Sequence, residues 1–152
     1  KKLFNEGFDI MLFLVGNIED KNLHKIIMRN KEFISHYEHN SNPQKFMQIS
    51  DIFCIPSFRE GFGLSVIEAS SCELPILGTN IYGLKDSIAN NYTGILFKLG
   101  DRSDFYNKLK KLIIDKDLRR DLGKNGRKRA ISDFNKKDVV KFIDLHIRNL
   151  IN

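Results

Sequence analysis

The sequence predicts an α/β fold, namely an open parallel sheet with helices on both faces, and three observations support this. Strand-length apolar runs alternate along the chain with stretches whose apolar residues recur at helical spacing. The connections between consecutive runs are too long for hairpins, which favours parallel pairing. A chain of 152 residues, 41% of them hydrophobic, is long enough to close one core, so residues 1–152 are predicted to form a single domain.

The first third of the chain is predicted to run strand, helix, strand, helix, strand. Residues 9–16 and 52–55 are continuous apolar runs, which are typical of strands buried on both faces of a parallel sheet. Asp20 is a candidate N-cap, because its carboxylate can accept free N–H groups at the start of a helix. Between the two buried strands we expect a helix from Asp20 to just before Lys31, a strand at residues 33–37 and a helix at residues 44–49.

The rest of the chain continues the alternation and ends in helices. A helix at residues 64–72 is expected before a strand at residues 75–78, and a helical turn at residues 84–89 precedes a hairpin-like segment at residues 94–97. The final elements are a helix at residues 101–115 capped by Asp101 or Ser103, a helical stretch from Leu118 with a break at residues 123–126, and a helix at residues 137–150.

Composition excludes several classes of protein. No apolar run reaches the roughly 20 residues needed to span a bilayer, and the start of the chain has no signal-peptide pattern. Cys54 and Cys72 each lie in an apolar segment, so we expect both thiols to be buried, reduced and inert, as in a cytoplasmic protein. The four histidines show no metal-ligand spacing, and no metal site is predicted.

The net charge of +6 is concentrated in one basic segment, residues 119–137, which holds eight Lys or Arg residues and two Asp residues. Such a segment can contact an anionic lipid surface, phosphate or nucleic acid, or it can be a solvated helical face. No nucleic-acid-binding motif accompanies the charge, and aromatic residues are not interleaved with it beyond a single phenylalanine, Phe134, so a nucleic-acid partner is not expected. Contact with anionic lipid or phosphate and a solvated helical face are equally compatible with the sequence.

The loop at residues 56–64 is the candidate binding site, because ligands of open parallel sheets bind beyond the carboxyl ends of strands. Its two glycines let backbone amides approach a ligand, and the following helix offers free N–H groups to phosphate or hydroxyl oxygens. With a helix start near Leu64, Glu60 and Glu68 can reach one ligand and accept hydrogen bonds from vicinal hydroxyls. Alternatively, Glu60 only complements the helix dipole and Glu68 is a solvated residue.

Residues 50–94 resemble the donor-binding domain of retaining glycosyltransferases of family four, whose two Rossmann-like domains make up the GT-B fold. Two glutamates eight residues apart around a Gly-Phe-Gly loop are the most specific part of this resemblance. Weaker similarity extends to Gly16 near the start and to residues 122–127 near the end. The matching motifs are Ser50-Asp51, Pro56-Ser57, Glu60-Gly61-Phe62-Gly63, Glu68-Ala69, Pro75-Ile76 and Tyr92-Thr93-Gly94-Ile95-Leu96.

The resemblance implies a role for each residue of the candidate site. Glu60 would bind and orient the donor sugar at the catalytic centre, and Glu68 would hold the ribose of the nucleotide. The donor-binding set would further include Pro56 and Ser57, the backbone amides of Gly61, Phe62, Gly63 and Leu64, and a group near the nucleobase made of Gly16, Asn17, His36 and Tyr37.

The sequence also departs from the family pattern. Residues 1–7 look like the end of the helix that follows the family's first strand, so this strand, with its diphosphate-binding Arg and Lys, is expected to be missing. The amino-terminal acceptor domain is expected to be missing as well, which predicts a fragment of a longer enzyme with weak binding and no turnover by itself. Glu73 replaces a glycine that many relatives have after the helix, which can change how that helix ends.

By this resemblance the function is retaining transfer of a hexosyl or N-acetylhexosaminyl group from a UDP- or GDP-linked sugar to an acceptor hydroxyl, with no cofactor and no required metal. The loop at residues 82–86 resembles that of enzymes of capsule or lipopolysaccharide synthesis, which implies a lipid-linked or surface-glycan acceptor at the inner face of the plasma membrane. The alternative is a non-catalytic module that binds a nucleotide sugar.

Overall fold

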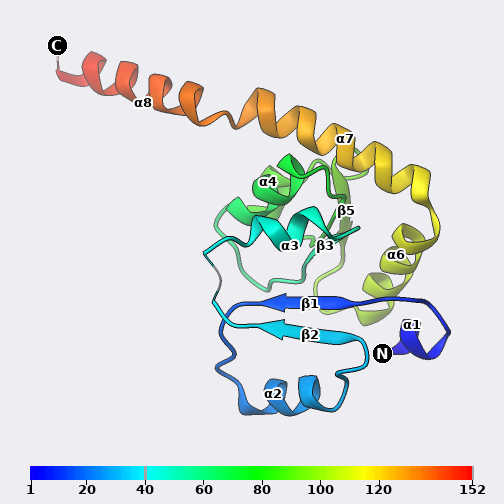
Figure 1. Cartoon of the computed structure of the whole chain (residues 1–152). Helices are drawn as coiled ribbons and strands as arrows, with labels where there is room; N and C mark the ends of the chain where they lie inside the picture. Colours follow the sequence, from blue (N-terminus) through cyan, green and yellow to red (C-terminus); the bar gives the residue numbers. More distant parts are fainter. Residues whose placement is uncertain (40, 152) are drawn as a thin grey trace. The chain divides into compact units, whose positions relative to one another are not determined.

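The computed structural model describes residues 1–39 and 41–151. These residues form eight helices and five strands, which alternate through most of the chain (Figure 1). The chain divides into two compact units, unit 1 with Lys1–Phe46 and unit 2 with Met47–Asn152. The strands of each unit form a parallel sheet of their own, with strand orders β1-β2 and β3-β4-β5. Parallel pairing is thus confirmed, whereas the expected single sheet is two sheets because no ladder of described residues joins β1 or β2 to β3.

Unit 1 contains a two-stranded sheet with one helix packed against it. Its elements are α1 (Lys2–Asn5), β1 (Leu12–Val15), α2 (Lys21–Met28) and β2 (Ile34–Tyr37), and α3 (Gln44–Gln48) spans the boundary to unit 2. The predicted cap of α2 is confirmed, since the Asp20 carboxylate accepts the backbone N–H of Asn22 at 2.7 Å. Ile27, Phe33 and Ile34 form the buried core of this unit.

The prediction that residues 9–16 form a strand buried on both faces was wrong. The strand is shorter, and Leu12 and Val15 at its two ends are exposed. Only its middle is covered: Leu14 packs against the core of unit 1, and the Phe13 ring lies near the rings of Tyr37 and Phe46. A sheet of two short strands offers too few neighbours to bury a whole apolar strand.

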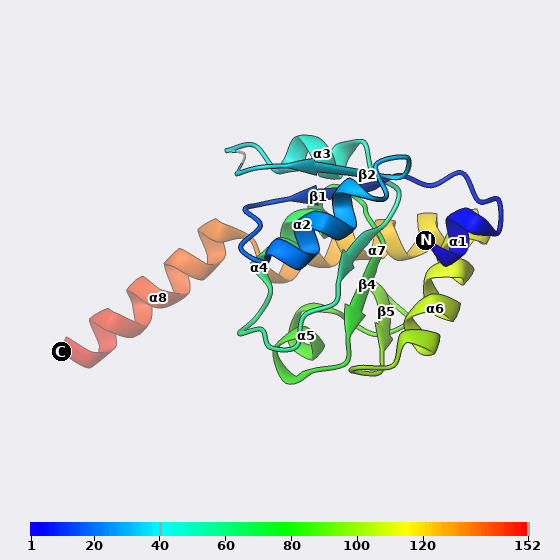
Figure 2. The same cartoon turned by 90° about the horizontal axis from the view of Figure 1, so that it is seen from below.

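Unit 2 is built around a three-stranded parallel sheet whose middle strand is fully buried. Its strands are β3 (Phe53–Ile55), β4 (Ile76–Thr79) and β5 (Gly94–Phe97), and its helices are α4 (Leu64–Ser71), α5 (Tyr82–Ser87), α6 (Arg102–Ile114), α7 (Lys116–Asp133) and α8 (Lys136–Ile151). Consecutive residues of β4 point to opposite faces: Ile76 joins a cluster with Val66 and Leu84, and Leu77 joins one with Leu112. Helices therefore cover both faces, as predicted, and Figure 2 shows α5 and α6 on opposite sides of β4 and β5.

The hairpin-like interpretation of residues 94–97 was wrong. They form β5, which pairs in parallel with β4, because the chain passes through α5 before it returns to the sheet. The glycine that suggested a turn is needed for close packing instead. A Cβ atom at Gly94 would lie 2.5 Å from the backbone oxygen of Ile76. The helical turn expected at residues 84–89 also begins earlier, at Tyr82.

The break expected at residues 123–126 does not exist, since α7 is continuous from Lys116 to Asp133. Gly123 and Gly126 lie one turn apart on the side of α7 that packs against the end of α4. A Cβ atom at Gly123 would overlap the backbone oxygen of Glu73, and one at Gly126 would lie 3.4 Å from the Ser70 side chain. Tertiary packing, rather than a turn, accounts for these glycines.

The end of α4 explains the replacement of glycine by Glu73. The N–H of Leu74 donates to the oxygen of Ala69 at 3.1 Å, and the N–H of Glu73 donates to that of Ser70 at 2.9 Å. This is the Schellman pattern, which requires a left-handed residue, and Glu73 has a φ of 61°. The helix thus ends as it would with glycine, at the cost of placing a side chain in a strained conformation.

The last helix, α8, leaves its apolar residues exposed. In both views it continues past the end of α7 and projects away from the sheet of unit 2 (Figures 1 and 2). Among the described residues, no helix combines the length and apolar character required to cross a membrane. The exposed large apolar side chains of α8 are Val139, Val140, Phe142, Ile143, Leu145, Ile147 and Leu150.

Candidate functional site

The candidate site lies where β3 passes into α4, at the carboxyl end of the strand. Glu60 is half-buried, and its Oε1 accepts a hydrogen bond from the Ser57 hydroxyl at 3.0 Å. This bond fixes one carboxylate oxygen of Glu60 and leaves the other oxygen able to accept a hydrogen bond from a ligand hydroxyl. Pro56, immediately after the strand, and Gly61 are exposed beside it.

The start of α5 packs against the glycine loop, which we define as residues 60–63. A Cβ atom at Gly83 would overlap the backbone oxygens of both Glu60 and Gly61, so only glycine permits this approach. Gly63 has a φ of 76°, and a Cβ atom there would lie 2.9 Å from a methyl group of Leu84. Both contacts fix the backbone of the loop, and this packing role of Gly83 and Leu84 was not predicted from the sequence, which suggested only a resemblance of residues 82–86 to surface-glycan enzymes.

The amino terminus of α4 has no side-chain cap, since its N-cap residue is Gly63. The helix starts at Leu64, as predicted, and Leu64 is 73% exposed. Glu68 follows four residues later and is also exposed, so it lies one turn along the same side of the helix. The free N–H groups and the partial positive charge of the helix start, with Glu60 before it and Glu68 one turn along it, can bind a ligand that carries phosphate and hydroxyl groups.

The four residues expected near a nucleobase lie close together in unit 1, at the carboxyl ends of β1 and β2. The Nε2 atom of His36 donates to the backbone oxygen of Gly16 at 2.7 Å, because a carbonyl oxygen can only accept. The N–H of Gly16 donates to the oxygen of Tyr37 at 2.9 Å, and the Asn17 side chain accepts the N–H of His39 at 3.3 Å. Tyr37 is exposed, and its ring lies 4.7 Å from that of Phe46.

The arginines of the basic segment have a role that the sequence analysis missed. Arg119 donates to the backbone oxygens of Leu112 and Ile113 near the end of α6. Arg127 donates to the last carbonyl of α4, that of Ser71. Arg129 donates to the last two carbonyls of α5. Three guanidinium groups of α7 therefore bind the carboxyl ends of three helices, where free carbonyls and the helix dipole favour a positive charge.

The other basic side chains of this segment that the structure describes are exposed. Arg120 pairs with Asp117 at 3.0 Å and with Asp121 at 3.5 Å, and all three side chains are mostly exposed. Lys124, Lys128 and Lys137 are also exposed. The charge of the segment is thus divided between arginines that join helices and residues that face solvent.

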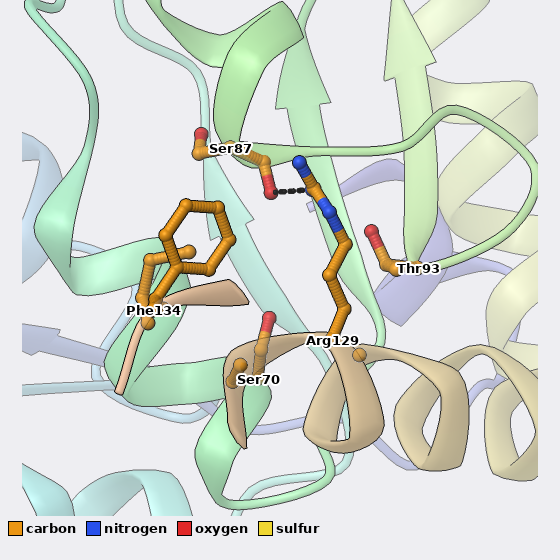
Figure 3. A pocket seen from close by; sticks show the side chains of 8 residues that line it. Ser70, Ser87, Thr93, Arg129 and Phe134 are labelled. Atoms are coloured by element: carbon orange, nitrogen blue, oxygen red, sulfur yellow. Dashed lines mark hydrogen bonds between the residues drawn. The ribbon is translucent and has the colours of Figure 1, made fainter. Parts of the chain in front are cut away.

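A narrow crevice between α4, α5 and α7 lies behind the glycine loop (Figure 3). Ser70, Ser87, Thr93, Arg129 and Phe134 line it together with apolar neighbours, and the crevice is too narrow to admit a water molecule. It is therefore a packing contact between helices rather than a space for a ligand.

The two cysteines pack against the core clusters of unit 2 and not in the candidate site. Burial raises the pKa of Cys54 to about 12, so this thiol stays protonated at neutral pH, in agreement with the expected inert role. Neither Cys54 nor Cys72 forms a disulfide. Among the described residues, no three His, Cys, Asp or Glu side chains are grouped as metal ligands.

Residues 2–129 match the sequence model of the family described as "Glycosyl transferases group 1". The capsular polysaccharide biosynthesis glycosyltransferase CapM of Staphylococcus aureus is 32% identical over 144 residues, which cover 91% of this chain and 38% of CapM. An Escherichia coli UDP-Gal:alpha-D-GlcNAc-diphosphoundecaprenol alpha-1,3-galactosyltransferase is 36% identical over 107 residues, or 70% of this chain and 27% of the relative. The chain thus spans well under half the length of these relatives.

The fold is similar to that of solved glycosyltransferase-related structures. The structure of Anabaena Alr3699/HepE in complex with UDP superposes with a TM-score of 0.86 at 19% identity, covering 92% of this chain and 41% of HepE. At this level of identity the similarity establishes the fold.

Proposed function

The chain belongs to the family described as glycosyl transferases group 1, and from this premise we propose that it is the donor-binding half of a retaining glycosyltransferase. Its fold is that of the Rossmann-like carboxy-terminal half of the GT-B fold. The donor is a nucleoside diphosphate sugar, and the observation that carries this proposal is the uncapped amino terminus of α4 with Glu60 beside it. HepE and CapM support it, since HepE was solved with UDP and CapM is named for capsular polysaccharide biosynthesis.

In the proposed complex each group of residues in the candidate site binds a different part of the nucleotide sugar. The amides of Gly61, Phe62, Gly63 and Leu64 contact the donor diphosphate and sugar, where the free N–H groups and the helix dipole favour negative charge. Glu60, oriented by Ser57, accepts hydrogen bonds from the sugar hydroxyls. Glu68 accepts hydrogen bonds from the ribose. Gly16, Asn17, His36 and Tyr37 contact the base.

During transfer, the bond between the anomeric carbon and the diphosphate oxygen breaks, and its electron pair leaves with the nucleoside diphosphate. The acceptor oxygen forms the new bond on the same face of the sugar, so configuration is retained, and its proton passes to the leaving diphosphate oxygen. The helix start stabilises the charge that develops on the leaving diphosphate. Glu60 orients the sugar in this scheme and forms no covalent bond to it.

The activity of the whole protein includes parts that this chain does not contain. We propose a longer protein with an amino-terminal acceptor domain and a first strand that carries basic residues for the diphosphate. The relatives support this, because the chain covers only 38% of CapM and 27% of the E. coli galactosyltransferase. The chain by itself then binds donor weakly and does not catalyse transfer.

The proposed acceptor is a lipid-linked or surface-glycan intermediate at the inner face of the plasma membrane. The E. coli relative supports this, since its name describes an acceptor carried on diphosphoundecaprenol. Within such a protein the exposed lysines of residues 119–137 can contact anionic lipid.

Titration of the protein with a panel of UDP- and GDP-linked sugars tests the proposal. We expect saturable binding, with Glu68→Ala weakening the affinity for the free nucleotide and for every nucleotide sugar of the panel. Full nucleotide affinity in Glu68→Ala would contradict the ribose role. If the full-length gene product binds nucleotide sugars but does not turn them over with lipid-linked acceptors, the protein is a binding module and not a transferase.

A further inference from the structure

We propose that Arg129 of α7 and Phe134, the residue that follows α7, are positioning residues, which hold the glycine loop in its donor-binding conformation. This inference rests on the proposed function, since the ligand of the loop is taken to be a nucleoside diphosphate. Every contact in it lies within unit 2. Arg129 and Phe134 lie about seventy residues beyond the loop in sequence and reach it through two sets of contacts.

The first set of contacts is aromatic. The Phe62 ring of the glycine loop meets the Phe134 ring edge to face, with a centroid distance of 5.3 Å and an interplanar angle of 62°. The Arg129 guanidinium lies over the same Phe134 ring, with its Cζ atom 5.1 Å from the centroid. Both Phe62 and Phe134 are half-buried. One side chain of the loop is thus joined through Phe134 to Arg129.

The second set of contacts runs through α5. Arg129 donates from Nη1 to the oxygen of Ser87 at 2.8 Å (Figure 3). It also donates from Nη2 to the oxygen of Asp86 at 2.7 Å. These two bonds fix the end of α5. Gly83, in the first turn of the same helix, packs directly on the backbone oxygens of Glu60 and Gly61. Since α5 has only six residues, holding its end also holds the surface against which the loop backbone rests.

The chemistry of Arg129 suits a positioning role. Its guanidinium donates to two carbonyls, pairs with Asp133 at 3.3 Å through Nε and lies over a ring, while only 23% of the side chain is exposed. The bond to the Ser87 carbonyl is partly buried beside the narrow crevice, whereas the bond to the Asp86 carbonyl is exposed. A guanidinium engaged in this way restrains the loop from behind and does not itself reach a ligand.

Without Arg129 both sets of contacts weaken together. The end of α5 loses its charged partner, Phe134 loses the group that packs on it, and Phe62 loses a fixed neighbour. The amides of the loop would then sample conformations in which they no longer converge on one anion. The expected result is a weaker affinity for nucleotide in a protein that remains folded.

Arg119 provides a matched control within the same helix. It also donates to two carbonyls near a helix end, those of Leu112 and Ile113, at 2.6 and 2.7 Å. That helix, α6, packs on the opposite face of the sheet from α4. Arg119→Met therefore removes a similar stabilising contact with no connection to the loop.

The test compares Arg129→Met with Arg119→Met, well below the melting temperature of either variant. Hydrogen exchange should become faster at the amides of residues 61–64 in Arg129→Met and stay unchanged there in Arg119→Met. Affinity for UDP and GDP should fall roughly three- to thirtyfold in Arg129→Met only. Phe134→Leu should act like Arg129→Met, and Phe134→Tyr, which keeps the ring, should retain the wild-type affinity. If Arg129→Met does not fold, the two Phe134 variants provide the same comparison.

Equal exchange at the loop in the two arginine variants would overturn the inference, as would a change in melting temperature with unchanged loop exchange. The proposed function fails separately, if the wild-type protein binds neither UDP nor GDP. In that event the exchange measurement still decides whether Arg129 and Phe134 hold the loop.

Discussion

The helices of unit 2 begin in two different ways. At the start of α6 the Asp101 carboxylate accepts the N–H groups of Ser103 and Asp104, and α7 starts with Asp115 in the same role. At the start of α4, Gly63 provides no side chain at all. A carboxylate cap fills the position that an anionic ligand would take, so the start of α6 is closed and the start of α4 is open.

The capped helix starts contribute to the stability of the fold, whereas the uncapped start of α4 leaves its N–H groups available to a ligand. Omitting a cap typically costs about 1 kcal/mol of helix stability. Aspartate residues cap α2, α6 and α7, so the missing cap of α4 is a difference between helices of the same chain. α4 is held instead by its core residues Val66 and Ala69, which are fully buried, and by its carboxyl end, where Arg127 donates to the Ser71 carbonyl and α7 packs closely at Gly123. An open amino end paired with a tightly held carboxyl end is what a binding helix requires.

The largest expected effect comes from adding a side-chain atom at Gly83, where α5 packs against the glycine loop. Gly83→Ala introduces a Cβ atom that overlaps the backbone of Glu60 and Gly61, and we expect it to lower the free energy of unfolding by about 1–3 kcal/mol and to abolish nucleotide binding. Gly61→Ala is the control for stability, since its Cβ atom would meet no atom within 4 Å. Denaturant unfolding of both variants measures this, and equal stabilities would contradict the packing described for α5.

Two substitutions, one beside the start of α4 and one at the start of α6, test binding and stability separately. Glu60→Gln should weaken the affinity for a UDP-sugar about tenfold with little change in melting temperature, because the hydrogen bonds that a carboxylate accepts from the sugar become weaker. Asp101→Ala should lower the melting temperature by a few degrees and leave the affinity unchanged, because it removes only the cap of α6. Calorimetric titration and thermal melting of both variants give the four values. Loss of affinity in Asp101→Ala would refute the separation.

A substitution at the carboxyl end of α4 should have a smaller effect of opposite sign, namely a gain in the free energy of unfolding. Glu73→Gly relieves the left-handed conformation at a φ of 61° and should raise the free energy of unfolding by about 0.5–1 kcal/mol. The ion pair lost with Arg127 is exposed and long, at 3.6 Å, and contributes little. Nucleotide affinity should not change. A less stable Glu73→Gly protein would mean that this ion pair outweighs the backbone strain.

The smallest expected effect is a pH dependence of the stability that Asp101 and Asp104 give to the start of α6. The pKa of Asp101 is lowered mainly because its carboxylate accepts the backbone N–H of Asp104, and the pKa of Asp104 is lowered mainly by its hydrogen bond with Lys108. The folded state therefore binds these protons less readily than the unfolded state. Their stabilisation is complete above the usual Asp range, near about pH 4, and is lost as the pH falls through the lowered values.

Thermal melting of wild type and Asp101→Asn across the acid range measures this dependence. Asn keeps a capping oxygen without a titrating group, so the variant should lose less melting temperature on acidification than the wild type. If the melting temperatures of the two proteins fall equally as the pH is lowered, titration of Asp101 does not contribute to the loss of stability in acid.

Local features of the fold could be predicted from the sequence, and features that depend on distant contacts could not. The caps Asp20 and Asp101 act within three residues of their own position, and both predictions are confirmed. Asp115 was interpreted as the end of one helix, although it also caps the next. Gly123 was interpreted as a break because its partner, the carbonyl of Glu73, lies fifty residues away in sequence.

The same distinction applies to the candidate site. The loop, the start of α4 at Leu64 and the shared side of Leu64 and Glu68 follow from a short motif with helical spacing. Gly83, Phe134 and Arg129 carry no such pattern, and their contacts with the loop exist only after α5 and α7 have packed. A GxxG spacing in a charged helix was the one available signal that α7 approaches another element closely.

A titration of the protein with UDP and then GDP, followed by amide proton–nitrogen NMR, tests the central claim most directly. The open start of α4 should respond and the closed start of α6 should not. We predict saturable shifts at the amides of Gly61, Phe62, Gly63 and Leu64 and no shifts at Ser103 and Asp104. Equal shifts at the two helix starts, or none at the glycine loop, would contradict the assignment of this loop as the nucleotide site.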